Sequence, residues 1–174
     1  INIPTTLLAM VDASVGGKTG INFNGLKNEI GVFSPAEYVL IDTELPKSLD
    51  TRNLLSGYAE MLKHGIISTE AHWAELLKFD IDRIDYEELK RLVAQSVQIK
   101  EDIVEQDPYE KGIRKALNVG HTVGHAFESL ALELNQHVLH GYAVAWGIVC
   151  ELYHSYLKVG FPKDKLRQTV QFIK

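Results

Sequence analysis

The stretch Leu54–Ile66, with the sequence LLSGYAEMLKHGI, decides how most of the chain can fold. Its apolar side chains recur at intervals of three and four residues, which is the spacing of one face of an α-helix. The apolar positions are Leu54, Leu55, Tyr58, Ala59, Leu62 and Ile66. We therefore predict an amphipathic helix, and this helix carries Glu60 and His64 one turn apart.

Helical patterns continue from this stretch toward the end of the chain. Asp85 followed by Glu88 is an acidic variant of a capping box, and it predicts a helix that runs to about Val104 before Asp107-Pro108 breaks it. Further helices are predicted from His121 to Leu134, from His140 to Leu157 and from about Lys163, with Gly160 and Pro162 between the last two. The chain beyond Pro46 should thus be mainly α.

The segment before this helical region has a different composition. Glycines at Gly16, Gly17 and Gly20 punctuate it, and Tyr38–Asp42 is a short run of β-forming residues. These features predict loops and short strands. The first residues, INIPTTLLA, lack an initiator methionine and resemble the middle of a folded domain, so we expect the chain to be part of a longer protein.

Length and charge exclude several classes of protein. The 174 residues are 45% hydrophobic, enough for one substantial core, and the net charge of -5 disfavours nonspecific nucleic-acid binding. The single cysteine, Cys150, ends the apolar run from Tyr142, which is too short to cross a membrane. We expect Cys150 to be a buried core thiol and the protein to be cytoplasmic, without a signal peptide.

Four histidines lie within twenty positions of one another: His121, His125, His137 and His140. His121 and His125 are one helical turn apart, so their imidazoles point to the same side and could bind a divalent metal such as zinc. Two ligands do not make a site. Glu60 and His140 are further candidates, but His64 competes with them, so spacing alone leaves the ligand set open.

Cationic residues near the glycines and the histidines suggest a pocket for a small anionic molecule. They are Lys18, Lys27, Lys63, Lys100 and Arg114. The segment Asp12–Gly20 has small residues that let backbone amides approach a phosphate, although it lacks the first glycine of a Walker A loop. The simpler interpretation of Lys100, Glu110 and Arg114 is a solvated surface with an ordinary Glu110–Arg114 helix salt bridge.

Taken together, these segments resemble the 3-dehydroquinate synthase family over essentially the whole chain. The matching stretches are 3–9, 11–20, 27–28, 57–65, 118–128 and 140–141. The resemblance implies a mainly α, metal-binding portion of a two-domain α/β enzyme. Residues 1–45 would be the end of the dinucleotide-binding domain, and residues 46–174 would be a helical metal- and substrate-binding domain that is truncated at its C-terminus.

The resemblance also implies roles for individual residues. It selects Glu60, His121 and His140 as metal ligands, leaves His64 out and makes His125 a substrate-side residue. The residues implied to line the substrate pocket are Lys18, Asn28, Lys63, Lys100, Glu110, Arg114, Asn118 and His125, with Asp12 between substrate and cofactor. The implied cofactor contacts are Thr5, Thr6, Asp12, Lys18 and Lys27 with Leu45 to Ser48, a stretch that departs from the family's usual wording.

The activity implied by the resemblance is a phosphate-eliminating lyase reaction, which forms 3-dehydroquinate from 3-deoxy-arabino-heptulosonate 7-phosphate. The family uses NAD and Zn²⁺ or Co²⁺ and tends to form homodimers; no membrane or nucleic-acid partner is implied. Alternatives are a related cyclase that makes 2-deoxy-scyllo-inosose or a valiolone, a metal-dependent polyol dehydrogenase, and a non-catalytic metal-binding or dimerisation module. Because the family's glycine-rich pyrophosphate turn lies upstream of Ile1, we expect this chain alone to be nearly inactive.

Overall fold

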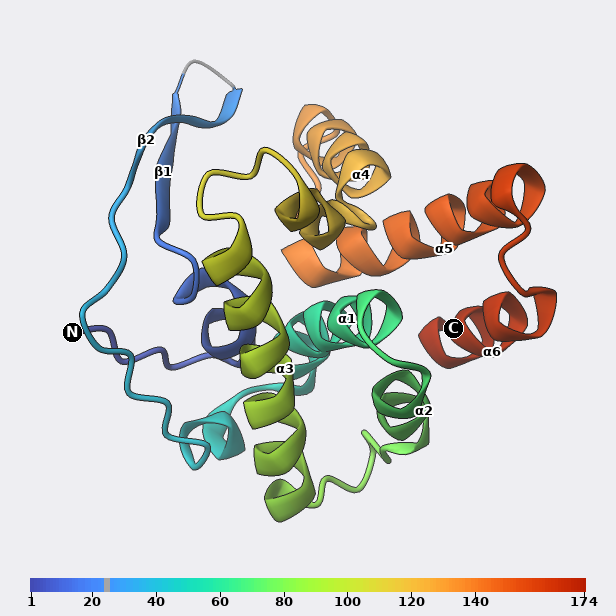
Figure 1. Ribbon diagram of the computed structural model, residues 1–174, viewed down its shortest axis with the longest axis horizontal. Coiled ribbons are helices and arrows are strands. Elements are labelled where there is room, and N and C mark those ends of the chain that lie inside the picture. Colours follow the sequence, from blue (N-terminus) through green and yellow to red (C-terminus); the bar gives the residue numbers. More distant parts are fainter. Residues whose placement is uncertain (24–25) are drawn as a thin grey trace.

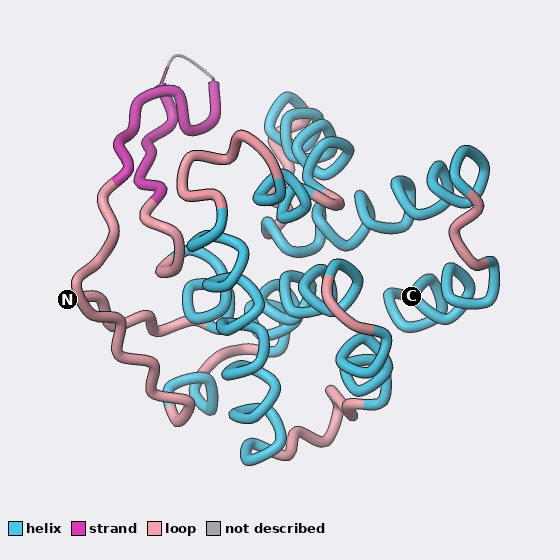
Figure 2. The backbone as a smooth tube through the Cα atoms, in the orientation of Figure 1, coloured by secondary structure: helices cyan, strands magenta, loops and turns pink. Residues whose placement is uncertain are grey.

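The computed structural model describes residues 1–23 and 26–174, and the side chains of residues 22 and 26–28 also lie outside that description. Within the described part the chain is mostly helical, with one antiparallel hairpin (Figures 1 and 2). The prediction of a mainly α fold is confirmed.

The α-helices are α1 (Thr51–Ile67), α2 (Glu70–Lys78), α3 (Tyr86–Gln106), α4 (His121–Glu133), α5 (His140–Val159) and α6 (Lys163–Ile173). Short helical turns are η1 (Ala9–Ala13), η2 (Leu45–Ser48) and η3 (Ile113–Asn118). Asp50 caps α1 by accepting a hydrogen bond from the Asn53 amide, and Asp85 caps α3 through the amides of Glu87 and Glu88. These caps fix where the two helices start. The sequence did not predict α2 or η1.

The N-terminal segment forms a hairpin that extends away from the helices (Figure 1). Strands β1 (Lys18–Phe23) and β2 (Leu26–Phe33) pair antiparallel, with Lys18 opposite Phe33. The predicted strand at Tyr38–Asp42 is reduced to an isolated bridge between Asn2 and Val39. A strand needs a ladder of partners, and Asn2 supplies only two backbone hydrogen bonds to this run.

Two apolar clusters hold the helices together. In the first, Leu7, Met10 and Val11 pack against α1, α2 and α3, including Tyr58 and Leu92. The second joins α5 to α6 and is formed by Val144, Ile148, Leu152 and Leu166. Asp12 follows the fully buried Val11 and lies between α1 and α3, where its carboxylate is close to Lys63 and Lys100.

Glycines let α5 approach two other helices very closely. A Cβ at Gly141 would overlap the Ser56 carbonyl of α1, and a Cβ at Gly147 would overlap the carbonyl of Gly120. Gly120 has φ +82°, a left-handed conformation that suits glycine, and it immediately precedes α4. The first residues of α4 and α5, His121 and His140, are thereby brought beside α1.

Cys150 is exposed, so the prediction of a buried core thiol is wrong. It follows the buried Ile148 by two positions and therefore points about 160° away from it around α5. An apolar neighbourhood in sequence does not bury a residue on the outer side of a helix. Among the described residues, no helix combines the length and apolar character needed to cross a membrane.

Candidate metal centre and anion pocket

Glu60, His121 and His140 converge at the centre of the molecule from α1 and from the first turns of α4 and α5. Glu60 is fully buried. Its Oε1 atom lies 3.6 Å from His121 Nε2 and 3.4 Å from His140 Nε2. Oε1 has no hydrogen-bond partner among the described residues, which is unusual for a buried carboxylate oxygen.

These separations fit a tetrahedral divalent ion. Zinc bonds of about 2.0–2.1 Å to nitrogen and oxygen place neighbouring ligand atoms about 3.3–3.4 Å apart. The separations from Glu60 Oε1 to the Nε2 atoms of His140 and His121, 3.4 and 3.6 Å, require little contraction. Two imidazoles and one carboxylate also match the donors of catalytic zinc sites, which keep a position open for water or substrate.

The protonation of the three groups suits a metal site. Burial alone would raise the pKa of Glu60, but the nearby Lys63 ammonium and the two histidines hold it well below its usual range. Burial lowers the pKa of His121. Burial also opposes the charged form of His140, yet its hydrogen bond to Glu128 and the charge of Glu60 raise its pKa to about 9. A metal at this site must therefore displace a proton from His140.

A second group, Asp12, Glu60 and His64, also brings three potential ligand atoms within 4.8 Å of one another. Lys63 pairs with Glu60 Oε2 and lies 3.7 Å from Asp12 Oδ1, and Lys100 Nζ lies 2.7 Å from the same oxygen. Two ammonium groups thus already neutralise these carboxylates and would repel a second cation. This charge distribution favours the group that contains His121 and His140.

Asp12, Glu60, Lys63 and Lys100 together form one wall of a charged interior. Lys63 is almost fully buried. Burial acts to lower its pKa, but the charges of Glu60 and Asp12 have the larger combined effect, so the pKa of Lys63 is raised. Burial instead lowers the pKa of the buried Lys100, against the opposing effect of Asp12. Lys100 also donates to the Asp12 backbone carbonyl. Two carboxylates and two ammonium groups therefore balance one another in this wall.

Arg114 and Glu110 do not form the predicted surface salt bridge. Glu110 has φ +57° and is not helical, so its carboxylate contacts Lys18 and accepts a hydrogen bond of 2.6 Å from Asn118. Arg114 is buried and donates to the carbonyls of Pro108 and Gly16. The interpretation of Lys100, Glu110 and Arg114 as a solvated surface is wrong because tertiary contacts cover Lys100 and Arg114.

Arg114 also borders a cleft of about 430 Å³ that lies between the Gly16-Gly17 turn and the end of α3. Phe33 and Tyr109, which stack edge to face, form part of its lining. Glu101 and Glu105 line the cleft as well, so its charge is mixed.

The remaining residues that the sequence predicted for the site do not belong to the group formed by Glu60, His121 and His140. His125 is about half exposed, and its ring lies 5.5 Å from that of His121. Thr5 is exposed, and Thr6 Oγ1 accepts from the Ala9 amide. The turn η2, with Leu45 and Ser48, lies at the opposite end of the molecule from the hairpin that carries Lys18 (Figure 1). Lys27 and Asn28 belong to β2, where their side chains lie outside the described residues.

Two carboxylates near the centre were not predicted. Glu128 Oε1 lies 3.1 Å from His140 Nδ1, and Glu151 Oε2 accepts a 2.8 Å hydrogen bond from the Gly120 amide at the start of α4. Glu128 is one turn beyond His125 on the same helix, so helical spacing could have found it. Glu151 lies 31 residues from its partner and has no local signal.

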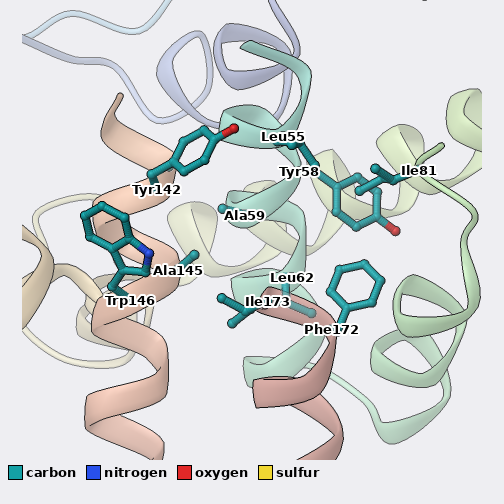
Figure 3. Close-up of a pocket in the computed structure, with 11 residues that line it drawn as sticks. Leu55, Tyr58, Ala59, Leu62, Ile81, Tyr142, Ala145, Trp146, Phe172 and Ile173 are labelled. Atoms are coloured by element: carbon teal, nitrogen blue, oxygen red, sulfur yellow. The ribbon is translucent and has the colours of Figure 1, made fainter. Parts of the chain in front are cut away.

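An apolar cavity of about 110 Å³ lies on the other side of α1, between α5 and α6 (Figure 3). Tyr142 and Trp146 border it from α5, and Phe172 and Ile173 border it from α6. Tyr58 of α1 lines it, and Glu60 points about 160° away from Tyr58 around the helix. Helix α1 therefore separates an apolar space from the charged centre.

Sequence comparisons match both parts of the chain to one family. Residues 1–56 match the model described as 3-dehydroquinate synthase N-terminal, and residues 57–174 match the one described as 3-dehydroquinate synthase C-terminal. The chain is 61% identical over its full length to a 3-dehydroquinate synthase of Parabacteroides distasonis, and 43% identical over 98% of its length to one of Streptococcus pyogenes. It spans about half the length of these relatives, 49% and 47%.

Two solved structures illustrate the similarity in fold. A 2-epi-5-epi-valiolone synthase from Streptomyces hygroscopicus, solved with NAD⁺ and Zn²⁺ bound, aligns with a TM-score of 0.88 at 26% identity and covers 98% of this chain and 48% of that chain. A 2-deoxy-scyllo-inosose synthase, complexed with carbaglucose-6-phosphate, NAD⁺ and Co²⁺, aligns over 98% of this chain and 47% of that chain. Its TM-score is 0.85 at 24% identity, so this second likeness concerns the fold alone.

Proposed function

Because this chain belongs to the 3-dehydroquinate synthase family, we propose that it supplies the metal- and substrate-binding part of an enzyme that converts 3-deoxy-arabino-heptulosonate 7-phosphate to 3-dehydroquinate and phosphate. The observation that carries this proposal is the convergence of Glu60, His121 and His140 beside two buried lysines. An acidic chain that buries lysines next to a metal-type donor set is suited to a small anionic substrate.

Glu60, His121 and His140 would hold the divalent ion, with zinc or cobalt as the candidates. A bound ion of this kind acts as a Lewis acid that polarises a substrate oxygen. Glu60 is ionised and buried, which suits a fixed carboxylate ligand. His64 would remain a neutral structural residue because its Nδ1 pairs with Ser96 Oγ at 2.8 Å.

The cationic residues would bind and orient the anionic groups of the substrate. Lys18 is half exposed and pairs with Glu110, and such a pair contributes little stability, so a phosphate could displace the carboxylate at low cost. Arg114 would hold a phosphate or carboxylate through its planar guanidinium. Asn28, Asn118 and His125 would complete this pocket.

Lys63 and Lys100 would steady negative charge that develops near the reacting carbons. Both ammonium groups are already oriented by Asp12, so they need little rearrangement when the substrate binds. Asp12 would lie between substrate and cofactor and would keep these two lysines in place.

NAD would accept and return a hydride, and the proposed contacts in this chain are Thr5, Thr6, Asp12, Lys18, Lys27, Leu45 and Ser48. They are spread along the chain over the segment before η1, η1 itself, the strands β1 and β2, and η2. We therefore expect the chain alone to turn over substrate very slowly or not at all, whereas a protein that also contains a complete dinucleotide-binding domain is expected to be active.

A different sugar phosphate cyclase is the second candidate, because the valiolone synthase shares this fold at 26% identity. The 61% identity to a 3-dehydroquinate synthase weighs against it, as do Lys100 and Arg114, which suit a carboxylated substrate. A product assay on the protein in its full natural length separates the two. Formation of an inosose or a valiolone in place of 3-dehydroquinate would exclude the main proposal.

Metal analysis tests the ligand set directly. We expect the purified chain to retain zinc or cobalt, and Glu60→Ala, His121→Ala and His140→Ala each to lose it, because each removes one of three protein ligands. His64→Ala is the matched control from the competing group and should keep the metal. If His64→Ala loses the ion while Glu60→Ala retains it, the proposed ligand set is wrong.

A further inference from the structure

We propose that Glu128 is a positioning residue that holds His140 in the orientation needed to bind the metal and so sets the affinity of the site. This inference rests on the proposed ligand set of Glu60, His121 and His140. It adds a residue that does not itself bind the ion.

The geometry around His140 shows how Glu128 would act. Glu128 is buried, and its Oε1 lies 3.1 Å from His140 Nδ1, while Nε2 of the same ring lies 3.4 Å from Glu60 Oε1. A neutral imidazole donates from one nitrogen and offers a lone pair on the other. A carboxylate that accepts from Nδ1–H therefore leaves the lone pair on Nε2, which faces the other ligands.

The two proposed histidine ligands differ in what holds their Nδ1 atoms. His121 Nδ1 lies 3.3 Å from the Val119 carbonyl, which is a neutral backbone acceptor. His140 has a charged acceptor, and hydrogen bonds to charged groups are shorter and about twice as strong as neutral ones. His140 should thus be the more firmly oriented ligand and the stronger electron donor, and a single substitution can remove that support.

Glu128 also reaches toward the substrate side. Its second oxygen, Oε2, lies 4.0 Å from His125 Nε2. The Glu128 carboxylate therefore lies near both a proposed metal ligand and a proposed substrate contact. The ligand, His140, begins α5, and the substrate contact, His125, lies in α4.

A purely structural role makes a different prediction. Glu128 lies near the start of α5, where a negative charge stabilises a helix regardless of which side chain carries it. Glu128→Asp separates the two roles, because it keeps the charge near the helix but is one methylene too short to reach His140. Glu128→Gln keeps the length and removes the charge.

The test is zinc affinity, measured by competition with a chromophoric chelator, together with the visible absorption spectrum of the Co²⁺-loaded protein. We expect both Glu128→Gln and Glu128→Asp to bind zinc about 10- to 100-fold more weakly, and to change the Co²⁺ spectrum because one ligand is reoriented. Glu133→Gln is the matched control, an exposed glutamate on the same helix, and should behave as the unmodified chain. Far-UV circular dichroism of each metal-free variant verifies that its overall helix content matches that of the unmodified chain.

The outcomes separate this inference from the metal site itself. Zinc affinity of Glu128→Asp equal to that of the unmodified chain, while Glu60→Ala loses zinc, would overturn the positioning role and leave the site intact. Equal zinc affinity in the unmodified chain and in Glu60→Ala would overturn the ligand set and this inference with it. Loss of affinity in both Glu128 variants, with the Glu133→Gln control unchanged, supports the inference.

Discussion

His64 is a histidine that the fold keeps neutral. It is fully buried, its Nδ1 pairs with Ser96, and burial, followed by the nearby Lys63 charge, lowers its pKa to about 3. This imidazole makes the free energy of unfolding depend on pH, because His64 binds a proton near pH 6.5 in the unfolded chain but not in the folded chain.

The sign of this dependence is fixed by the lowered pKa. Between pH 6.5 and about 3 the unfolded state holds more protons at His64, so its contribution to stability is complete above pH 6.5 and is lost as the pH falls. We expect the free energy of unfolding to fall by up to about 1.4 kcal/mol per pH unit in this window. His64→Asn, which keeps a polar atom near Ser96 but does not titrate, should flatten this slope.

Urea denaturation of the metal-free chain at several pH values measures the effect. Glu60 and Asp12 also have lowered pKa values and also favour unfolding in acid, so the difference between the unmodified chain and His64→Asn is the relevant quantity. Parallel pH profiles for the two proteins would show that His64 titrates normally in the folded state.

Single residues near the site could be predicted only in part. Spacing identified His121 and His125 as a pair and Glu60, His64 and His140 as further candidates. It could not choose among them, because the arrangement of α4 and α5 around α1 is a tertiary property. The Glu110–Arg114 pair was misinterpreted for a related reason. A helical i,i+4 spacing has meaning only where the backbone is helical, and Glu110 lies in a left-handed turn.

At the scale of elements, the close contact of α4 with α5 is highly sensitive to substitution. We expect Gly147→Ala to cost about 3 kcal/mol or more, because the added methyl group would overlap the backbone carbonyl of Gly120 and would force the helices apart. The same displacement should weaken zinc binding, since His121 directly follows Gly120.

Gly112→Ala is the appropriate control for this prediction. A Cβ there would have Asp107 Oδ2 as its nearest neighbour at 3.7 Å, which is ordinary contact. Equilibrium unfolding in urea compares the two variants. Equal stability of Gly147→Ala and Gly112→Ala would contradict the close approach of α4 and α5.

Long helices with local start and stop signals were predicted well, whereas elements that depend on distant contacts were not. Asp85 before α3 and Gly160 after α5 are read directly from neighbouring residues. Helix α2 has nine residues and a short apolar pattern, so its packing against α1 and α6 contributes much of its stability. The run Tyr38–Asp42 has strand propensity but only one bridging partner among the described residues.

On the scale of the whole molecule, two apolar clusters and an open apolar cavity surround the central helix α1. The cavity side carries Trp146, which is 40% exposed, whereas Trp73 is 7% exposed and lies beside α6. The protein therefore contains one accessible and one protected indole.

Acrylamide quenching of tryptophan fluorescence should report on this difference. We expect strong quenching in the unmodified chain, and much weaker quenching in Trp146→Phe, in which only the protected Trp73 remains. Repeating the titration over a range of protein concentrations tests the expected homodimer. Quenching that weakens as the concentration rises would indicate that a second copy covers the α5–α6 face, and concentration-independent quenching would place any dimer contact elsewhere.

The convergence of α1, α4 and α5 on one centre also has a consequence for the order of folding. Glu60 is separated from His121 and His140 by about 60 and 80 residues of chain, so bringing them together closes long loops at a substantial entropic cost. Such a site cannot assemble from neighbouring residues and bind an ion early in folding, as a small zinc finger does. Metal uptake should instead be a late event that locks an already collapsed chain, and its removal should speed unfolding more than it slows refolding.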